Sequence, residues 1–243
     1  MTSAGATGES GETELEAART ALRAHVETLV GPGAIPRFEE ALTHPSFANE
    51  SGVRDNQRLE FLGDSVLGLC VSELLANEYA DADEGRLTRM RSALVNAEAL
   101  AAWARRVGLG ASLAFGRGAK LGTEREQTNV LADAAEALVA AVYDARGLEG
   151  ARALVRDMCC GLIERADELG ASDPKSALQE RVQAHGMPAP TYRVVDVRGQ
   201  PHDQVFEVEV FVAEQPIARG EGRSKRLAER AAAAQALATL DPT

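Results

Sequence analysis

The strongest constraint on the fold is a helical segment, residues 57–79, that is mostly apolar and yet carries two carboxylates. Its leucine and valine side chains recur at helical spacing. Glu60 and Asp64 are four residues apart, so they lie one turn from each other on one face. Carboxylates on a largely buried helix are costly to desolvate unless a counter-charge, hydrogen bonds or a metal ion compensates. Taken alone, the pair has a plainer interpretation, which is an ion pair with Arg58 or another nearby arginine.

A second carboxylate pair lies in another segment of strong helix formers, residues 128–143. Asp133 and Glu136 are three residues apart and share one face, and they are the only charges between Glu126 and Asp144. If the two acidic faces meet, four carboxylates converge without a nearby His or Cys cluster. An all-oxygen set of this kind suits Mg²⁺ or Mn²⁺ better than it suits zinc.

Five short sequence blocks occur in order between about residue 36 and the C-terminus. They are Ala41–Ser46, Arg58–Asp64, Asp83–Gly85, Leu131–Asp133 and Glu136–Leu138. These blocks resemble those of the ribonuclease III family, and five in order are far more specific than any one of them. The resemblance implies a metal-dependent endoribonuclease that cleaves double-stranded RNA in RNA processing and decay. It further implies products with 5′-phosphate and 3′-hydroxyl ends.

The resemblance also implies roles for individual residues. Glu60, Asp64, Asp133 and Glu136 match the metal-binding positions of the family, with Mg²⁺ as the expected cofactor and Mn²⁺ as the alternative. Asp64 and Glu136 are the expected catalytic residues. Glu60 and Glu136 would ligate the metal directly, whereas Asp64 and Asp133 would ligate it or orient bound water. Phe61 matches an aromatic residue that packs into a partner subunit, which implies a homodimer; ordinary core packing is its alternative interpretation.

Three further positions, Gln57, Glu84 and His44, are expected to lie outside the set of metal ligands. Gln57 stands where the family often has Glu, so any outer metal or RNA contact made by that acid is in doubt here. Glu84 matches another acidic family position and would orient RNA or water, although a plain charge at a helix N-terminus explains it equally well. His44 precedes Pro45 and is expected to stabilise a turn rather than to ligate a metal.

Composition places the chain among globular proteins of a reducing compartment. The cysteines are Cys70, Cys159 and Cys160, which form neither a disulfide framework nor a zinc spacing, so we expect a cytoplasmic protein. No run approaches the roughly 18 apolar residues of a membrane span, and the N-terminus lacks the pattern of a signal peptide. The net charge of −11 argues against nucleic acid, but residues 173–243 carry 9 Lys and Arg against 10 Asp and Glu, with the bases clustered. Local patches rather than net charge decide contact with phosphates.

The periodicity predicts a multi-domain chain, with an all-α endonuclease domain followed by an α-β-β-β-α domain. We expect a disordered N-terminus over residues 1–12, an all-α catalytic domain over 13–169, a linker over 170–174 and a second domain over 175–243. The order of elements in the second domain resembles a double-stranded-RNA-binding domain. Within the first domain we expect one helix from Asp83 to about Val107, and another from about Leu148 to Leu169, after the Asp133 helix.

Three groups of residues in the second domain could span one face of A-form RNA. They are Ser176, Gln179 and Glu180 on the first helix, His202 in the following loop, and Ser224, Lys225 and Arg226 at the start of the last helix. The first two groups would meet ribose 2′-hydroxyls and the minor groove, and the third would meet phosphate. Glu229 stands where many such domains have Lys, which predicts a weaker grip on phosphate.

Two other functions compete with the endoribonuclease. A non-catalytic regulator that binds double-stranded RNA would have lost a carboxylate, and only Gln57 supports it. A helical metal-dependent hydrolase of small phosphate compounds explains the carboxylates but not the second domain.

Overall fold

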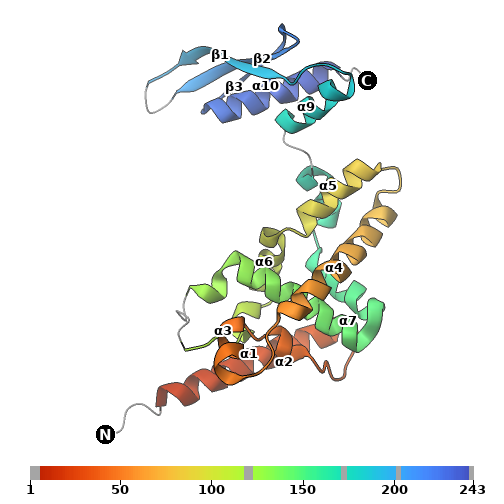
Figure 1. The fold of residues 1–243 in the computed structure, drawn as a ribbon, viewed down its shortest axis with the longest axis vertical. Coiled ribbons are helices and arrows are strands. Elements are labelled where there is room, and N and C mark those ends of the chain that lie inside the picture. The colour runs from red at the N-terminus through yellow and green to blue at the C-terminus, as the bar shows by residue number, and fades with distance from the viewer. Residues whose placement is uncertain (1–5, 118–122, 171–173, 201–203, 241–243) are drawn as a thin grey trace. The chain divides into compact units, whose positions relative to one another are not determined.

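The computed structural model describes residues 6–117, 123–170, 174–200 and 204–240. The chain divides into two compact units, Met1–Gly170 and Ala171–Thr243 (Figure 1). The first unit is helical, and the second has a three-stranded antiparallel sheet with helices α9 and α10. The expected fold class, an all-α domain followed by an α-β-β-β-α domain, is confirmed. In the described part of the chain, no helix is both long enough and apolar enough to span a membrane.

The first unit is built around the contact between two long helices, α4 and α7. Its α-helices are α1 (Ala6–Val30), α2 (Phe38–Ala41), α3 (Pro45–Ser51), α4 (Gln57–Glu78), α5 (Glu84–Leu94), α6 (Ala97–Arg106), α7 (Thr128–Met158) and α8 (Ala166–Gly170). Helix α4 buries Leu59 and Leu67, and α7 buries Leu138 among a row of alanines that let α4 come close. Further along the pair, Arg152 of α7 forms two hydrogen bonds with the carboxylate of Glu73 in α4.

The structure differs from the sequence-based expectation in three places. Helix α1 begins at Ala6, so residues 6–12 are helical rather than disordered, in keeping with the acidic residues that precede its apolar pattern. The expected helix from Asp83 to Val107 is two helices, because Asn96 caps α6 by accepting a hydrogen bond from Ala99 N at 2.9 Å. Gly147, at φ 64°, interrupts α7, and the helix then ends at Met158 rather than at Leu169.

The second unit packs both of its helices on one face of the sheet. Its elements are α9 (Pro174–Ala184), β1 (Thr191–Arg198), β2 (Val205–Val212), β3 (Gln215–Gly222) and α10 (Lys225–Leu240). The strands are ordered β1-β2-β3, and Val208 and Val210 of β2 are buried with Leu178 of α9 and Ala232 of α10. Buried and partly buried residues therefore alternate along the second half of β2.

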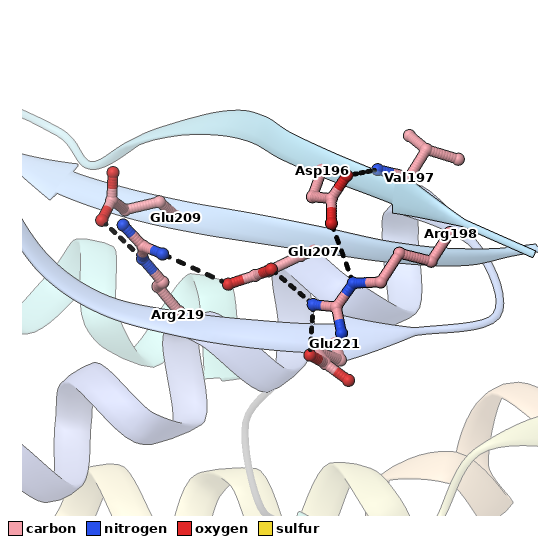
Figure 2. A network of polar contacts seen from close by, with 7 residues as sticks. All are labelled: Asp196, Val197, Arg198, Glu207, Glu209, Arg219 and Glu221. Carbon is pink, nitrogen blue, oxygen red and sulfur yellow. Dashed lines mark hydrogen bonds and ion pairs between the residues drawn. The ribbon is translucent and has the colours of Figure 1, made fainter.

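The opposite face of this sheet carries a network of ion pairs, which Figure 2 shows. Its charged members are Asp196, Arg198, Glu207, Glu209, Arg219 and Glu221. Arg198 contacts three carboxylates, one from each strand, at 2.6 to 2.9 Å. With four carboxylates and two guanidinium groups, the network has a negative net charge, so this face does not favour phosphate.

Candidate functional site

The four predicted carboxylates lie on the central helix pair. Glu60 and Asp64 occupy the first turns of α4, and Asp133 and Glu136 occupy the first turns of α7. Between the two acids of α4 lies Gly63, which is buried against α7 so tightly that a Cβ atom would overlap the carbonyl oxygen of Glu136. The contact between the two backbones therefore falls among the four carboxylates.

The carboxylates act on one another electrostatically. Burial, and then the charges of Asp64, Asp133 and Glu60, raise the pKa of Glu136 to about 7. Burial also raises the pKa of Glu60, and the charges of Asp133, Asp55 and Asp64 add to the effect. Burial raises the pKa of Asp133, and the charge of His44 acts in the opposite direction. The helix pair thus concentrates negative charge, and no described residue forms an ion pair with it.

The donor set fits a hard divalent cation by its chemistry. All four groups are carboxylates, and three of them are partly buried. Within the described residues, neither a hydrogen bond nor an ion pair from another side chain occupies them, so a cation would relieve their repulsion. The side chains do not form a finished cage, since no three His, Cys, Asp or Glu residues of the described chain come together closely enough to hold a metal ion. Binding would therefore require the carboxylates to turn toward the cation.

Two residues near this cluster were not recognised in the sequence as part of it. Asp55 contributes to the raised pKa of Glu60, and its Oδ1 accepts a hydrogen bond from Gln57 N at 3.2 Å at the start of α4. An Asp two residues before a helix is a signal for this turn. The charge of Glu124, in the short helix Glu124–Glu126, also acts on His44. Nothing in the local pattern around Glu124 indicates that proximity.

His44 has the structural role that the sequence suggested. It is the N-cap of α3, where its Nδ1 accepts a hydrogen bond from Ser46 N at 3.2 Å. Its ring lies 4.7 Å from that of Phe115, centroid to centroid. Burial lowers the pKa of His44, while the charges of Glu124, Asp133 and Asp55 oppose that shift. Its prediction as a residue that stabilises a turn is confirmed.

The remaining candidates of the first unit lie apart from the cluster or at its edge. Gln57 is the first residue of α4 and is exposed, one turn before Glu60. Glu84 begins α5, and its Oε1 accepts a hydrogen bond from Thr88 Oγ1 at 3.1 Å, so it has a local role in its own helix. Phe61 is 80% exposed, which excludes its interpretation as a core residue of this chain.

In the second unit, most predicted RNA contacts are exposed on two helices. Ser176, Gln179 and Glu180 are exposed on α9, and Ser224, Lys225 and Arg226 are exposed at the start of α10. The Ser224 hydroxyl accepts a hydrogen bond from Leu227 N at 3.3 Å and so caps α10. His202 lies outside the described residues. Glu229 forms an ion pair with Lys175 at 2.6 Å, a partner that the sequence did not indicate.

Comparisons with known proteins identify both units. Residues 37–161 match the family model described as ribonuclease-III-like, and residues 174–240 match the model of the double-stranded RNA binding motif. Ribonuclease 3 of Phenylobacterium zucineum is 46% identical over 219 residues, which cover 89% of this chain and 92% of that protein. Ribonuclease 3 of Thermobifida fusca is 46% identical over 224 residues, covering 86% and 93%.

A solved structure agrees with these sequence matches. The nuclease domain of ribonuclease III from Campylobacter jejuni is 32% identical and superposes with a TM-score of 0.50, covering 57% of this chain and 94% of that one. The matched segments contain the four clustered carboxylates and the exposed residues of α9 and α10. The chain therefore belongs to the ribonuclease III family.

Proposed function

We propose that this protein is an endoribonuclease that hydrolyses phosphodiester bonds of double-stranded RNA with divalent cations held by Glu60, Asp64, Asp133 and Glu136. One observation carries the proposal: the packing of α4 on α7 gathers four carboxylates that form no ion pair with the described residues. The family is metal-dependent, and the all-oxygen donor set favours Mg²⁺, with Mn²⁺ as the second choice.

The four carboxylates would have different roles in the reaction. Glu60 and Glu136 would ligate the cations directly, and Asp64 and Asp133 would ligate or orient bound water. Divalent cations, when bound, supply an activated water and a counter-charge for the leaving 3′ oxygen. The phosphorus–oxygen bond to the 3′ oxygen breaks as water adds to phosphorus, which leaves a 5′-phosphate and a 3′-hydroxyl. Asp64 and Glu136 are the residues whose loss should be most damaging to this step.

The second unit would supply affinity for the duplex. We assign residues 13–169 to catalysis and residues 175–243 to RNA binding, joined by a linker at residues 170–174. Exposed groups on α9 would meet 2′-hydroxyls, and Lys225 and Arg226 would meet phosphates near the N-terminus of α10. His202 would enter the minor groove. Deleting residues 173–243 should therefore weaken binding, and more so at higher salt.

We also infer that the working form is a homodimer. Phe61 and Leu69, which are eight residues apart on α4, are 80% and 49% exposed, so this helix leaves two large apolar side chains uncovered. Two equivalent active sites suit a substrate with two equivalent strands. The cellular setting that we infer is the cytoplasm, because the three cysteines are free thiols and two of them are buried.

The decisive experiment measures cleavage of an end-labelled RNA duplex with Mg²⁺ by wild type and by Glu136→Gln. We expect cleavage by wild type, loss of cleavage in the variant, retained RNA binding and products with 5′-phosphate ends. Glu78→Gln is the matched control, because Glu78 is an exposed carboxylate at the other end of α4. Undiminished cleavage by Glu136→Gln would place the active site elsewhere.

The same assay separates the non-catalytic regulator from the enzyme. Tight duplex binding by wild type without cleavage under any divalent cation would favour the regulator, which Gln57 alone supports. Restoring a carboxylate with Gln57→Glu would then test whether the missing acid is the cause.

A further inference from the structure

An ion pair inside the second unit joins its two helices. Lys175 Nζ donates a hydrogen bond to Glu229 Oε2 at 2.6 Å, which connects the start of α9 to the second turn of α10. The same ammonium group lies 4.6 Å from the ring centroid of Tyr192 in β1. One side chain thus contacts the other helix and the first strand.

The ion pair lies next to both groups of predicted RNA contacts. Lys175 directly precedes Ser176 and lies one turn before Gln179, while Glu229 lies one turn after Lys225. Both helices share a core through buried residues such as Leu178 and Ala228. The ion pair adds a direct contact between one defined position of α9 and one of α10.

The geometry argues against two simpler roles for these charges. Lys175 is directed to Glu229 and the Tyr192 ring, and its side chain is only 36% exposed, which does not suit a primary phosphate contact. Glu229 is 28% exposed and is neutralised by Lys175, so it does not act as an isolated charge that repels RNA. The acid that the sequence suggested as a weakness has a partner 54 residues away.

We propose that Lys175 and Glu229 are positioning residues that set the spacing between the RNA contacts of α9 and those of α10. A-form RNA presents its grooves and phosphates at fixed distances, and a domain of this kind touches two minor grooves and the phosphates between them. If α10 shifts along α9, the two groups no longer fit the duplex together. The inference rests on the proposed function of the second unit as a binder of double-stranded RNA.

The test is a double-mutant cycle on the full chain, with duplex affinity measured at several salt concentrations without divalent cations. The variants are Lys175→Gln, Glu229→Gln and the double variant. We expect each single variant to bind about fivefold more weakly, and the double variant to be no weaker than either, because one contact is lost in all three. The slope of log affinity against log salt should not change.

Two further variants serve as references for the double-mutant cycle. Lys225→Gln should flatten the salt slope by about 0.9, as the loss of a phosphate contact does. Arg193→Gln removes another ion pair of the same unit, with Glu214 at 2.8 Å, and should leave affinity unchanged. Thermal unfolding of every variant identifies a folding defect. The cycle repeated with Lys175→Met keeps the apolar stem of the side chain near Tyr192, in case the glutamine variant fails to fold.

Other outcomes would overturn the inference. Tighter binding by Glu229→Gln would show that Glu229 repels RNA, and a flatter salt slope for Lys175→Gln would show that Lys175 contacts phosphate. If the two single variants change duplex affinity in opposite directions and these changes cancel in the double variant, Lys175 and Glu229 act on RNA as two independent charges. A wild-type chain that binds no duplex would instead refute the proposed function of the unit.

Discussion

Gly63 of α4 packs directly on the backbone of Glu136 in α7, and a Cβ atom at position 63 would overlap the Glu136 carbonyl oxygen. Residue 63 lies between the two carboxylates of α4, and Glu136 is itself one of the carboxylates of α7. One contact therefore fixes the separation of the two helices and the separation of the acid pairs. Because the obstacle is backbone, a rotamer change of a neighbour cannot relieve it.

We predict that Gly63→Ala destabilises the first unit by about 3 kcal/mol and lowers its melting temperature by roughly 10 °C. The helices must separate to admit the methyl group, so cleavage should fall as well. Gly68→Ala is the matched control, because a Cβ at Gly68 meets nothing within 4 Å. Alanine in that helix position should instead stabilise by about 1 kcal/mol. Calorimetry of the two variants checks both, and equal melting temperatures would contradict the packing argument.

We predict that Glu136→Gln stabilises the metal-free protein at alkaline pH and not at acidic pH. The pKa of Glu136 is raised from 4.5 to about 7 by burial and by its neighbouring carboxylates. A raised pKa in the folded state means that the carboxyl group is tolerated when it is protonated, at low pH, and costs stability as pH rises through 7. The gain from Gln above pH 7 should be about 1 to 2 kcal/mol, since solvent screens this half-buried group.

Urea unfolding in EDTA between pH 4.5 and pH 8.5 measures that difference. Glu78→Gln is the control, because Glu78 is exposed at the far end of α4 and its substitution should have no comparable dependence on pH. A gain from Glu136→Gln that stays constant with pH would mean that the carboxylate is not held in a repulsive field.

We predict that divalent cations raise the melting temperature of wild type more at pH 8 than at pH 5.5. The cation competes with the proton at Glu136, so affinity falls as the carboxyl groups become protonated. With free cation tenfold above its Kd, the stabilisation should be about 1.4 kcal/mol. Asp64→Asn and Glu136→Gln should each lose most of this effect. An equal cation effect in wild type and in these variants would move the metal site away from α4 and α7.

Local patterns predicted the fold class and the acid cluster because both depend on the spacing of residues within single helices and strands. The change from helical to alternating apolar residues separates the two units, and two carboxylate pairs on apolar helices mark the cluster. The boundary at Asn96 was missed because the amphipathic pattern of α5 continues into α6, so that only the cap reveals the break. The start of α1, residues 6–12, was missed because the glycines and polar residues there have no apolar period, whereas the rest of that helix follows a helical pattern.

Long-range packing decided what the sequence did not reveal. His44 reaches the neighbourhood of Asp133 because the segment before α3 pairs with a residue 71 positions later, through the bridge between Thr43 and Ala114. Lys175 meets Glu229 because α9 and α10 pack on the same face of the sheet. In both cases each residue is unremarkable in its own segment, and the partner is set by tertiary structure.

We predict that Phe61→Asp converts the protein to a monomer without unfolding it. Phe61 is 80% exposed in the single chain, so its loss removes little packing from α4, whereas an aromatic residue central to an interface contributes about 2 to 4 kcal/mol to association. Sedimentation at micromolar concentration should show a dimer for wild type and a monomer for the variant, with unchanged helical circular dichroism. Leu227→Asp is the matched control, since Leu227 is a 51% exposed apolar residue of the second unit. A monomeric wild type would reject the dimer, and a dimeric Phe61→Asp would place the interface on a surface other than the one around Phe61.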